Sequence, residues 1–409
     1  MTSIIFENAN VFDGTNAELI EGASVLVDGS EIREVSTTHI ASACAERIDC
    51  SGKTLVPGLI DCHVHVYVDS LKAFALPQAP PTYRAHYARK FLDHVLSCGF
   101  TSVRDVAGGD HGLAMALRDG LIQGPRFFYG GLSLTQTGGH ADYRSPSEHV
   151  DCCACGVVGN MLAVHADGVD ECIKAAREEL RKGASHIKIM GSGGVMSPSD
   201  PIDRCQYSEA EIRAVVEECA RHGAYVCAHC HPAESVRRCV DFGVRSIEHG
   251  TLIDEATARF VAERGAFVVP TMAVIFALME DGPKMGLTEG SRRKLLAIHE
   301  QALRGLEIMK RAGVKMGFGT DLLGDQHVRQ CTEFSLRSEV LPPIDILRSA
   351  TAIGGEILQL KGRLGVIEPG ALADLLVVDG NPLRDINLLA ANGRAMTHIM
   401  ADGRLVKRS

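Results

Sequence analysis

Tryptophan is absent from this sequence of 409 residues, and all aromatic residues together make up only 5% of it. Long hydrophobic runs are also lacking. The longest extends from about Phe267 to Met279, contains Pro270, and is well short of the roughly 20 residues that span a bilayer. The first residues show neither a basic cluster nor a long apolar stretch, so no secretory signal is expected. We therefore expect a cytoplasmic protein that does not insert into a membrane.

An excess of positive charge is missing as well. The 42 Lys and Arg are outnumbered by 51 Asp and Glu, which gives a net charge of −9 and does not favour a nucleic-acid partner. The sequence has no G-x-S-x-G, no H-E-x-x-H, no P-loop and no G-x-G-x-x-G. These absences argue against serine hydrolases, H-E-x-x-H metalloproteases, P-loop nucleotidases and dinucleotide-binding enzymes.

Cysteine, by contrast, is frequent, with 14 residues scattered along the chain. A chain of this length builds its core without disulfides, so we expect reduced and mostly buried thiols. One cluster, Cys152, Cys153 and Cys155, stands out. It lacks the C-x-x-C pairs of a zinc ribbon, so a metal or redox role there is only the alternative.

The two ends of the chain resemble each other and differ from the middle. Short alternating segments with Asp-Gly turns occur near residues 23–29 and again near residues 398–406. The simplest interpretation is a small β-sandwich domain built from both termini, residues 1–57 plus 358–409. Residues 58–357 would then form a separate, inserted domain.

The middle alternates strand and helix patterns, as in an α/β protein. Eight candidate strands are Leu59–Val66, Thr101–Asp105, Arg126–Gly131, His186–Met190, Tyr225–His229, Ser246–His249, Phe267–Pro270 and Lys315–Thr320. Helical patterns between them end repeatedly in glycine, and the segment 208–222 begins with the capping-box pair Ser208 and Glu211. Eight such units predict a (β/α)8 TIM barrel, with a doubly wound sheet as the alternative.

Polar residues mark the ends of five of these strands. They are His63, His65, Lys188, His229, His249 and Asp321. His63 and His65 are two apart, so on a strand they point to the same face. Each histidine alone could be an ordinary hydrogen-bonded core residue. Lys188 between two isoleucines is less ordinary, because a buried ammonium must be paired, neutralised or reactive. Together, at the mouth of one barrel, the six predict a metal centre.

The order of these residues resembles the amidohydrolase superfamily over nearly the whole chain. The resemblance includes Pro57-Gly58-Leu59-Ile60-Asp61 before His63 and the late segment 370–375. It implies two divalent metal ions, usually zinc. One ion would be bound by His63, His65 and Asp321. The other would be bound by His229 and His249. Lys188, carboxylated on Nζ by carbon dioxide, would bridge them.

The resemblance also implies a reaction. Two metal ions lower the pKa of a shared water, so that a metal-activated hydroxide attacks a carbonyl. Asp321 would take the proton and later pass it to the leaving nitrogen. Asp321 would thus be both ligand and catalytic residue in the cleavage of an amide bond.

Two further segments, Ser133–Asp142 and Gly191–Pro198, look like one subgroup of that superfamily. Its members resemble Xaa-Pro dipeptidases, carboxypeptidases for C-terminal Arg or Lys, and ochratoxin-degrading amidases. All cleave an amide whose amine side carries a free carboxylate. By resemblance, His140 would bind or polarise the scissile carbonyl, although a loop histidine can also be bonded only locally. The partner is then a small molecule or dipeptide.

The pattern leaves several candidates for the residue that binds the substrate carboxylate. Dipeptidase relatives tend to carry Tyr where this chain has His231. His231 is therefore a candidate, together with Arg329 and Arg204 on barrel loops. Asp200 and Asp203 could instead select a basic side chain. We expect a neutral C-terminal residue, proline or an apolar one.

Deaminases of the same superfamily, which act on cyclic C=N substrates, are the alternative function. They usually bind one metal ion and need no carboxylated lysine, so Lys188 favours the amide hydrolases. A barrel that only binds or scaffolds would be expected to have lost some of the strand-end ligands. Relatives assemble into oligomers, and a homo-oligomer is expected here as well.

Overall fold

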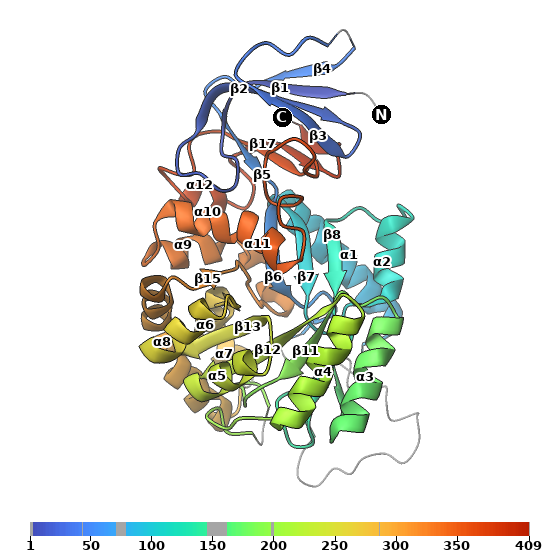
Figure 1. Cartoon of the computed structure of the whole chain (residues 1–409), viewed down its shortest axis with the longest axis vertical. Helices are drawn as coiled ribbons and strands as arrows, with labels where there is room; N and C mark the ends of the chain where they lie inside the picture. Colours follow the sequence, from blue (N-terminus) through green and yellow to red (C-terminus); the bar gives the residue numbers. More distant parts are fainter. Residues whose placement is uncertain are drawn as a thin grey trace.

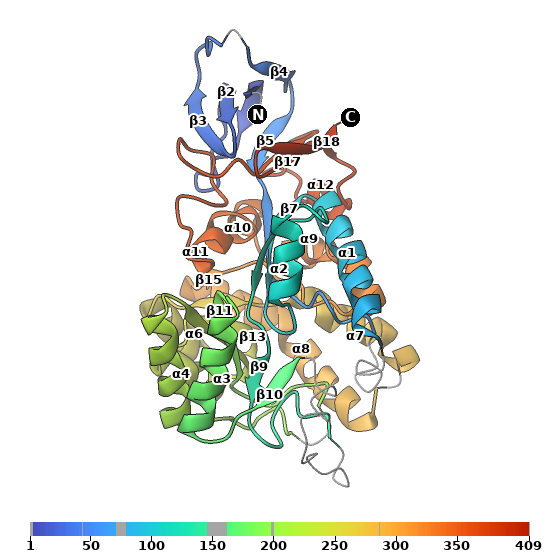
Figure 2. The same ribbon diagram turned by 90° about the vertical axis from the view of Figure 1, so that its right-hand side faces the viewer.

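The computed structural model describes residues 3–42, 44–70, 79–144, 162–197, 200–285 and 287–408. It contains a β domain that holds both chain ends and a larger body of alternating strands and helices (Figure 1). Figure 2, turned by 90°, shows the β domain again beyond one end of the larger body. Only Gly58 separates the last N-terminal strand of the β domain from the first strand of the larger body.

One hydrogen-bonded sheet makes up the β domain. Its strands are β1 (Ile4–Val11), β2 (Ile20–Asp28), β3 (Glu31–Ser36), β4 (Glu46–Asp49), β5 (Thr54–Pro57), β16 (Leu375–Val378), β17 (Met396–Ala401) and β18 (Arg404–Arg408). The order is β18-β17-β16-β5-β1-β2-β3, with β4 beside β1. Antiparallel pairing of β16 with β5 joins the two ends of the chain, and Val25, Leu55 and Val377 share one core. The small β domain built from both termini is thus confirmed.

Eight parallel strands form the larger body, and each matches a predicted strand. They are β6 (Leu59–Val64), β7 (Phe100–Asp105), β8 (Arg126–Tyr129), β11 (His186–Met190), β12 (Tyr225–Pro232), β13 (Ser246–Leu252), β14 (Phe267–Val269) and β15 (Lys315–Met316). Two short strands, β9 (Ser133–Thr135) and β10 (Ala163–His165), extend the sheet beside β11.

Main-chain hydrogen bonds close these strands into a ring. The amide of Cys62 donates to the carbonyl of Phe318 over 2.8 Å, which joins β6 to the segment after β15. On the other side, the amide of Ser185 donates to the carbonyl of Tyr129 over 3.0 Å and joins β8 to β11. An open, doubly wound sheet has no such closure, so the alternative fold is excluded and the TIM barrel is confirmed.

Helices surround the barrel and cover one end of it. They are α1 (Pro81–Ser97), α2 (His111–Arg118), α3 (Val169–Arg181), α4 (Glu209–Arg221), α5 (Ala233–Asp241), α6 (Glu255–Glu263), α7 (Met272–Met285), α8 (Glu289–Ala312), η3 (Gly324–Arg329), α9 (Thr332–Ser338), α10 (Pro343–Ser349), α11 (Ala352–Ile357) and α12 (Asn387–Ala390). The predicted capping box is present, since Ser208 and Glu211 cap the first turn of α4 reciprocally. Gly313 ends α8 at a φ of 73°, a left-handed conformation that favours glycine.

The described cysteines are mostly buried and free, as expected, with Cys44 exposed. The cluster of Cys152, Cys153 and Cys155 lies outside the described residues. Within the described ranges, no helix combines the length and the apolar character needed to cross a membrane.

A fully buried ion pair supports the strand end that leads to Asp321. Arg337 and Glu333 on α9 are 2.6 Å apart, and both side chains are 0% exposed. Arg337 also donates to the carbonyl of Gly317, just after β15, over 2.9 Å. The second Glu333 oxygen accepts from the amide of Ala273 at the start of α7. This pair therefore connects α9 to β15 and to α7.

Replacing Arg337 with methionine should lower the free energy of unfolding by about 3–5 kcal/mol, because Glu333 would stay buried without its counter-charge. Urea unfolding followed by circular dichroism measures this change. Arg259→Met, which removes an exposed partner of Glu255 on α6, is the control and should change stability by less than about 1 kcal/mol. Equal small losses in the two variants would contradict the supporting role.

Candidate active site

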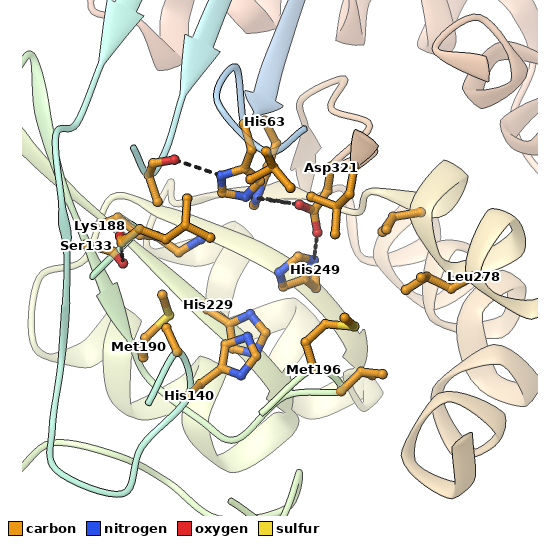
Figure 3. A pocket seen from close by; sticks show the side chains of 18 of the residues that line it. His63, Ser133, His140, Lys188, Met190, Met196, His229, His249, Leu278 and Asp321 are labelled. Carbon is orange, nitrogen blue, oxygen red and sulfur yellow. Dashed lines mark hydrogen bonds and ion pairs between the residues drawn. The ribbon is translucent and has the colours of Figure 1, made fainter. Parts of the chain in front are cut away.

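A cavity opens at the carboxyl ends of the barrel strands (Figure 3). Its histidine, lysine and aspartate side chains are His63, His65, His140, Lys188, His229, His231, His249 and Asp321. All six residues predicted to carry metal chemistry therefore line one cavity, together with His140 and His231. The strand order brings them together, because parallel strands of a barrel end at the same mouth.

Asp321 is the centre of this group. Its Oδ1 lies 3.1 Å from Nε2 of His65 and 3.4 Å from Nε2 of His63. Its Oδ2 lies 4.0 Å from Nδ1 of His249. Burial would raise the pKa of the carboxyl group, but the adjacent His63 and His65 hold the pKa of Asp321 well below its usual range. Asp321 is therefore an anion that can bind a cation or accept a proton.

The Nδ1 atoms of His63, on β6, and of His65, just after β6, each face a hydrogen-bond acceptor. Nδ1 of His63 lies 2.7 Å from Oε2 of Glu248, and Nδ1 of His65 lies 3.0 Å from the carbonyl of Ala107. Because both partners only accept, each Nδ1 carries a hydrogen. Nε2 is then the atom available to a metal ion, as in metal sites whose histidines are oriented by an outer carboxylate or carbonyl.

Glu248 is itself charged and balanced. It lies on β13, is 0% exposed, and accepts from Arg104 on β7 over 2.7 Å. Burial would raise the pKa of Glu248, yet the Arg104 charge and the His63 hydrogen bond hold that pKa well below its usual range. The chain of Arg104, Glu248 and His63 thus fixes one ring beneath the cavity.

His249 is the third member of the closest cluster. The ligand atoms of His63, His249 and Asp321 all lie within 4.8 Å of one another. The resemblance groups His249 with His229, and their ring centroids are indeed only 4.6 Å apart. His249 therefore lies between Asp321 and His229, in contact with both halves of the expected site.

Backbone strain is concentrated at this place. His249 has a φ of 76° and Asp321 a φ of 54°. Thr271, a β-branched residue, has a φ of 48° and bonds Nδ1 of His249 through Oγ1 over 2.7 Å. Left-handed conformations are costly for such residues and persist where the surrounding structure enforces them, often at functional sites.

Burial sets the charge of the other rings. It is the main reason that the pKa values of His229 and His249 fall well below the usual range of histidine. The pKa of His231 is lowered to about 3, again mainly by burial. His65 differs: burial opposes it, but the hydrogen bond and charge of Asp321 raise its pKa. Neutral imidazoles are the form that binds metal, and burial favours that form at His229 and His249.

Lys188 on β11 is 3% exposed and faces the same cavity. Among the described residues, its Nζ has no hydrogen-bond or ion-pair partner. Its charge nevertheless acts on His229, His249 and Glu248. A buried ammonium with no partner is costly, so this position fits a lysine that becomes an anionic ligand.

The two candidate substrate-binding histidines, His140 and His231, lie beside His229. The ring centroid of His140 is 4.2 Å from that of His229, and the two rings are stacked. The ring of His231 is 4.8 Å from His229, and its Nδ1 lies 3.3 Å from Oγ1 of Thr251. Neither is a mere surface residue, because both line the cavity.

The two arginine candidates for carboxylate binding, Arg204 and Arg329, lie outside the cavity lining. Arg329 on η3 contacts Glu280 at 2.5 Å and Asp281 at 3.2 Å on α7 and does not line the cavity. Its charge is already balanced by two carboxylates. Arg204 is exposed and also outside the cavity lining.

The acidic residues of the alternative, Asp200 and Asp203, do not line the cavity either. Asp203 is exposed and is absent from the cavity lining. Asp200 is buried, and its Oδ1 lies 3.4 Å from Nζ of Lys294 on α8. Neither carboxylate is presented to a basic substrate side chain.

The sequence pattern missed the apolar wall of the cavity. It consists of Val195 and Met196 before α4, Val274, Ile275 and Leu278 on α7, and Leu295 and Ile298 on α8. Their helical spacing predicts only a buried face, and which helix covers the mouth depends on packing. Glu248 was visible beside His249, but a carboxylate that reaches behind His63 cannot be recognised from one strand alone.

Comparison with known protein families identifies the family of this chain. A sequence model of the amidohydrolase family matches residues 54–406, which is most of the chain. The chain therefore belongs to the amidohydrolase family.

Individual relatives narrow the comparison to one subgroup. Ochratoxinase of Aspergillus niger is 33% identical over 372 residues, which cover 86% of this chain and 75% of that protein. A prolidase solved with N-methylphosphonate-L-proline superposes with a TM-score of 0.96 at 45% identity, over 100% of both chains. A Xaa-Pro dipeptidase with methionine in its active site superposes with a TM-score of 0.88 at 30% identity, over 99% of this chain and 100% of that chain. The predicted subgroup is thus confirmed.

Glu248→Gln should weaken metal binding by about 10- to 100-fold, because the charge that orients His63 is lost. Competition with a chelator of known affinity measures this without any substrate. Glu255→Gln, at an exposed position on α6, is the control and should leave the affinity unchanged. An unchanged affinity in Glu248→Gln would show that the outer carboxylate does not support the site.

Proposed function

We propose that this amidohydrolase cleaves an amide or peptide bond next to a free C-terminal carboxylate. The proposed substrates are dipeptides with an apolar or proline C-terminal residue, Xaa-Pro above all, or N-acyl amino acids. The observation that carries the proposal is the juxtaposition of the cluster around Asp321 with an apolar wall in the same cavity. The similarity to a prolidase and a Xaa-Pro dipeptidase supports it.

The donor set supports two divalent metal ions, with zinc as the expected metal. One ion would be held by His63, His65 and Asp321. The other would be held by His229 and His249. The Lys188 amine, which is buried and has no partner within the described ranges, supports carboxylation by carbon dioxide into a bridging ligand. When bound, such ions supply a water of lowered pKa and polarise the scissile carbonyl.

Asp321 would transfer the proton, and His140 would polarise the scissile carbonyl. Asp321 is ionised and faces the cavity, so its carboxylate would be placed to accept a proton from the attacking water. The same carboxyl group can then protonate the leaving nitrogen. His140, stacked on His229 in the cavity, would donate to the carbonyl oxygen as negative charge develops there.

We expect an apolar substrate side chain, because the cavity surface beside it is apolar. Apolar side chains of α7 and α8 form one side of the cavity. Asp200, the nearest candidate for a basic side chain, is already engaged by Lys294. A cationic side chain would be desolvated there without a counter-charge, which is costly. His231 would bind the substrate carboxylate as a hydrogen-bond donor. A homo-oligomer and a cytoplasmic location stay predictions.

A hydrolysis panel tests this function. Protein reconstituted with zinc and bicarbonate is assayed on dipeptides and N-acetyl amino acids that end in Pro, Leu, Phe, Arg or Lys, each as free acid and as amide. Free acids ending in Pro, Leu or Phe should exceed the basic substrates and all amidated controls by at least about 100-fold in kcat/KM, since a missing partner at a buried polar contact costs that much or more. Lys188→Met should be inactive, and Lys174→Met, at an exposed position of α3, should match the parent protein.

Other outcomes identify the alternatives. Leading activity on Arg or Lys substrates would instead support a basic carboxypeptidase. Hydrolysis of ochratoxin alone would support an amidase for aromatic N-acyl amino acids. No amide turnover, with turnover of cyclic C=N substrates, would contradict the proposal and support the deaminase class.

A further inference from the structure

We propose that Lys294 is a positioning residue for the reaction. Through Asp200 and the main chain of residues 194–197, it would hold the ring of His140 in place beside His229. The inference rests on the proposed function for its kinetic consequence. It also has a geometric consequence that can be measured without substrate.

Lys294 is enclosed by acceptors of the segment that follows β11. Its Nζ donates to the carbonyl of Gly194 over 2.9 Å, to that of Ser197 over 3.0 Å and to that of Asp200 over 2.5 Å. The Oδ1 atom of Asp200 lies 3.4 Å away. An ammonium has three N–H groups, so these acceptors use all of them. The Lys294 side chain is only 17% exposed.

Asp200 connects Lys294 to His140. Its side chain is 2% exposed, and Oδ2 accepts from the amide of Gly194 over 2.9 Å while lying 3.5 Å from Nδ1 of His140. Nδ1 of His140 also lies 2.5 Å from Oγ of Ser197. Both partners of this ring atom therefore belong to the segment that Lys294 anchors.

Steric contact fixes the same ring. A Cβ atom added at Gly194 would lie 2.3 Å from the His140 ring, so the ring rests directly on the main chain of Gly194. On its other side the ring stacks on His229 (Figure 3). A shift of the segment would therefore move the ring. A misplacement of about 1 Å at a reacting group can lower a rate by about 100-fold.

The position of Lys294 on α8 links this support to substrate recognition. Leu295 and Ile298, on the same helix, belong to the apolar wall of the cavity. The helix that contributes to the apolar wall thus also carries the cation that holds the His140 segment. Lys294 is a positioning residue and not a catalytic one, because it does not line the cavity.

Steady-state kinetics with the amide that the parent protein hydrolyses fastest test whether Lys294 affects the reaction rate. Lys294→Met should lower kcat by about 10- to 100-fold. Its KM should change by less than about threefold, because the wall is left in place. Lys294→Arg, which restores a cationic donor, should recover most of kcat. Arg293→Met, at the exposed neighbouring position of α8, should match the parent protein. Asp200→Asn combined with Lys294→Met should be far from additive, because the two act through one contact.

A spectroscopic measurement separates positioning from general destabilisation. In protein labelled with 15N-histidine and stripped of metal, the ring nitrogens of His140, assigned from a His140→Gln sample, should shift in Lys294→Met and not in Arg293→Met. Should Lys294→Met not fold, Lys294→Gln takes its place, since it keeps N–H donors and lacks the charge. Unchanged His140 nitrogens would overturn the proposal, whatever the rates. If the parent protein hydrolyses no amide, the proposed function fails, while the nitrogen shifts still decide the positioning role.

Discussion

A carboxylate that is only 17% exposed and is shared by three imidazoles is the constraint on which the rest of the site depends. Asp321 lies 3.1 Å from His65, 3.4 Å from His63 and 4.0 Å from His249. A buried charge needs compensation, either by protons on the rings or by cations bound among them. The barrel enforces the arrangement directly, because the amide of Asp321 donates to the carbonyl of His63 over 2.8 Å at the point of closure. The hydrogen bonding that closes the barrel therefore also places Asp321 beside His63.

Two pairs of oppositely charged residues fix histidine rings of the cavity. On one side, His63 is held by Glu248, and Glu248 by Arg104, with both charges at 0% exposure. On the other side of the cavity, His140 lies beside Asp200, which faces Lys294. In both cases a buried acid orients a ring, and a basic side chain compensates the charge of the acid. Such networks are stable only when every member is paired, which makes both sides sensitive to single substitutions.

The sequence predicts what strand order alone determines. His63, Lys188 and Asp321 could be identified because parallel strands must end at one mouth, whatever their packing. The ion pairs of Arg329 with Glu280 and Asp281 could not be predicted, because they depend on how η3 packs against α7. Lys294 could not be distinguished from Arg293 in a helical pattern. Only the docking of α8 onto the segment after β11 separates them, and docking is a tertiary property.

Under the proposed function, this donor set would hold two metal ions bridged by a modified Lys188. Anomalous diffraction at the zinc edge, from crystals grown with zinc and bicarbonate, tests it most directly. The account predicts two anomalous peaks, one among His63, His65 and Asp321 and one beside His229 and His249, with carbamate density on Nζ of Lys188. A single peak, or two peaks beside an unmodified Lys188, would contradict it.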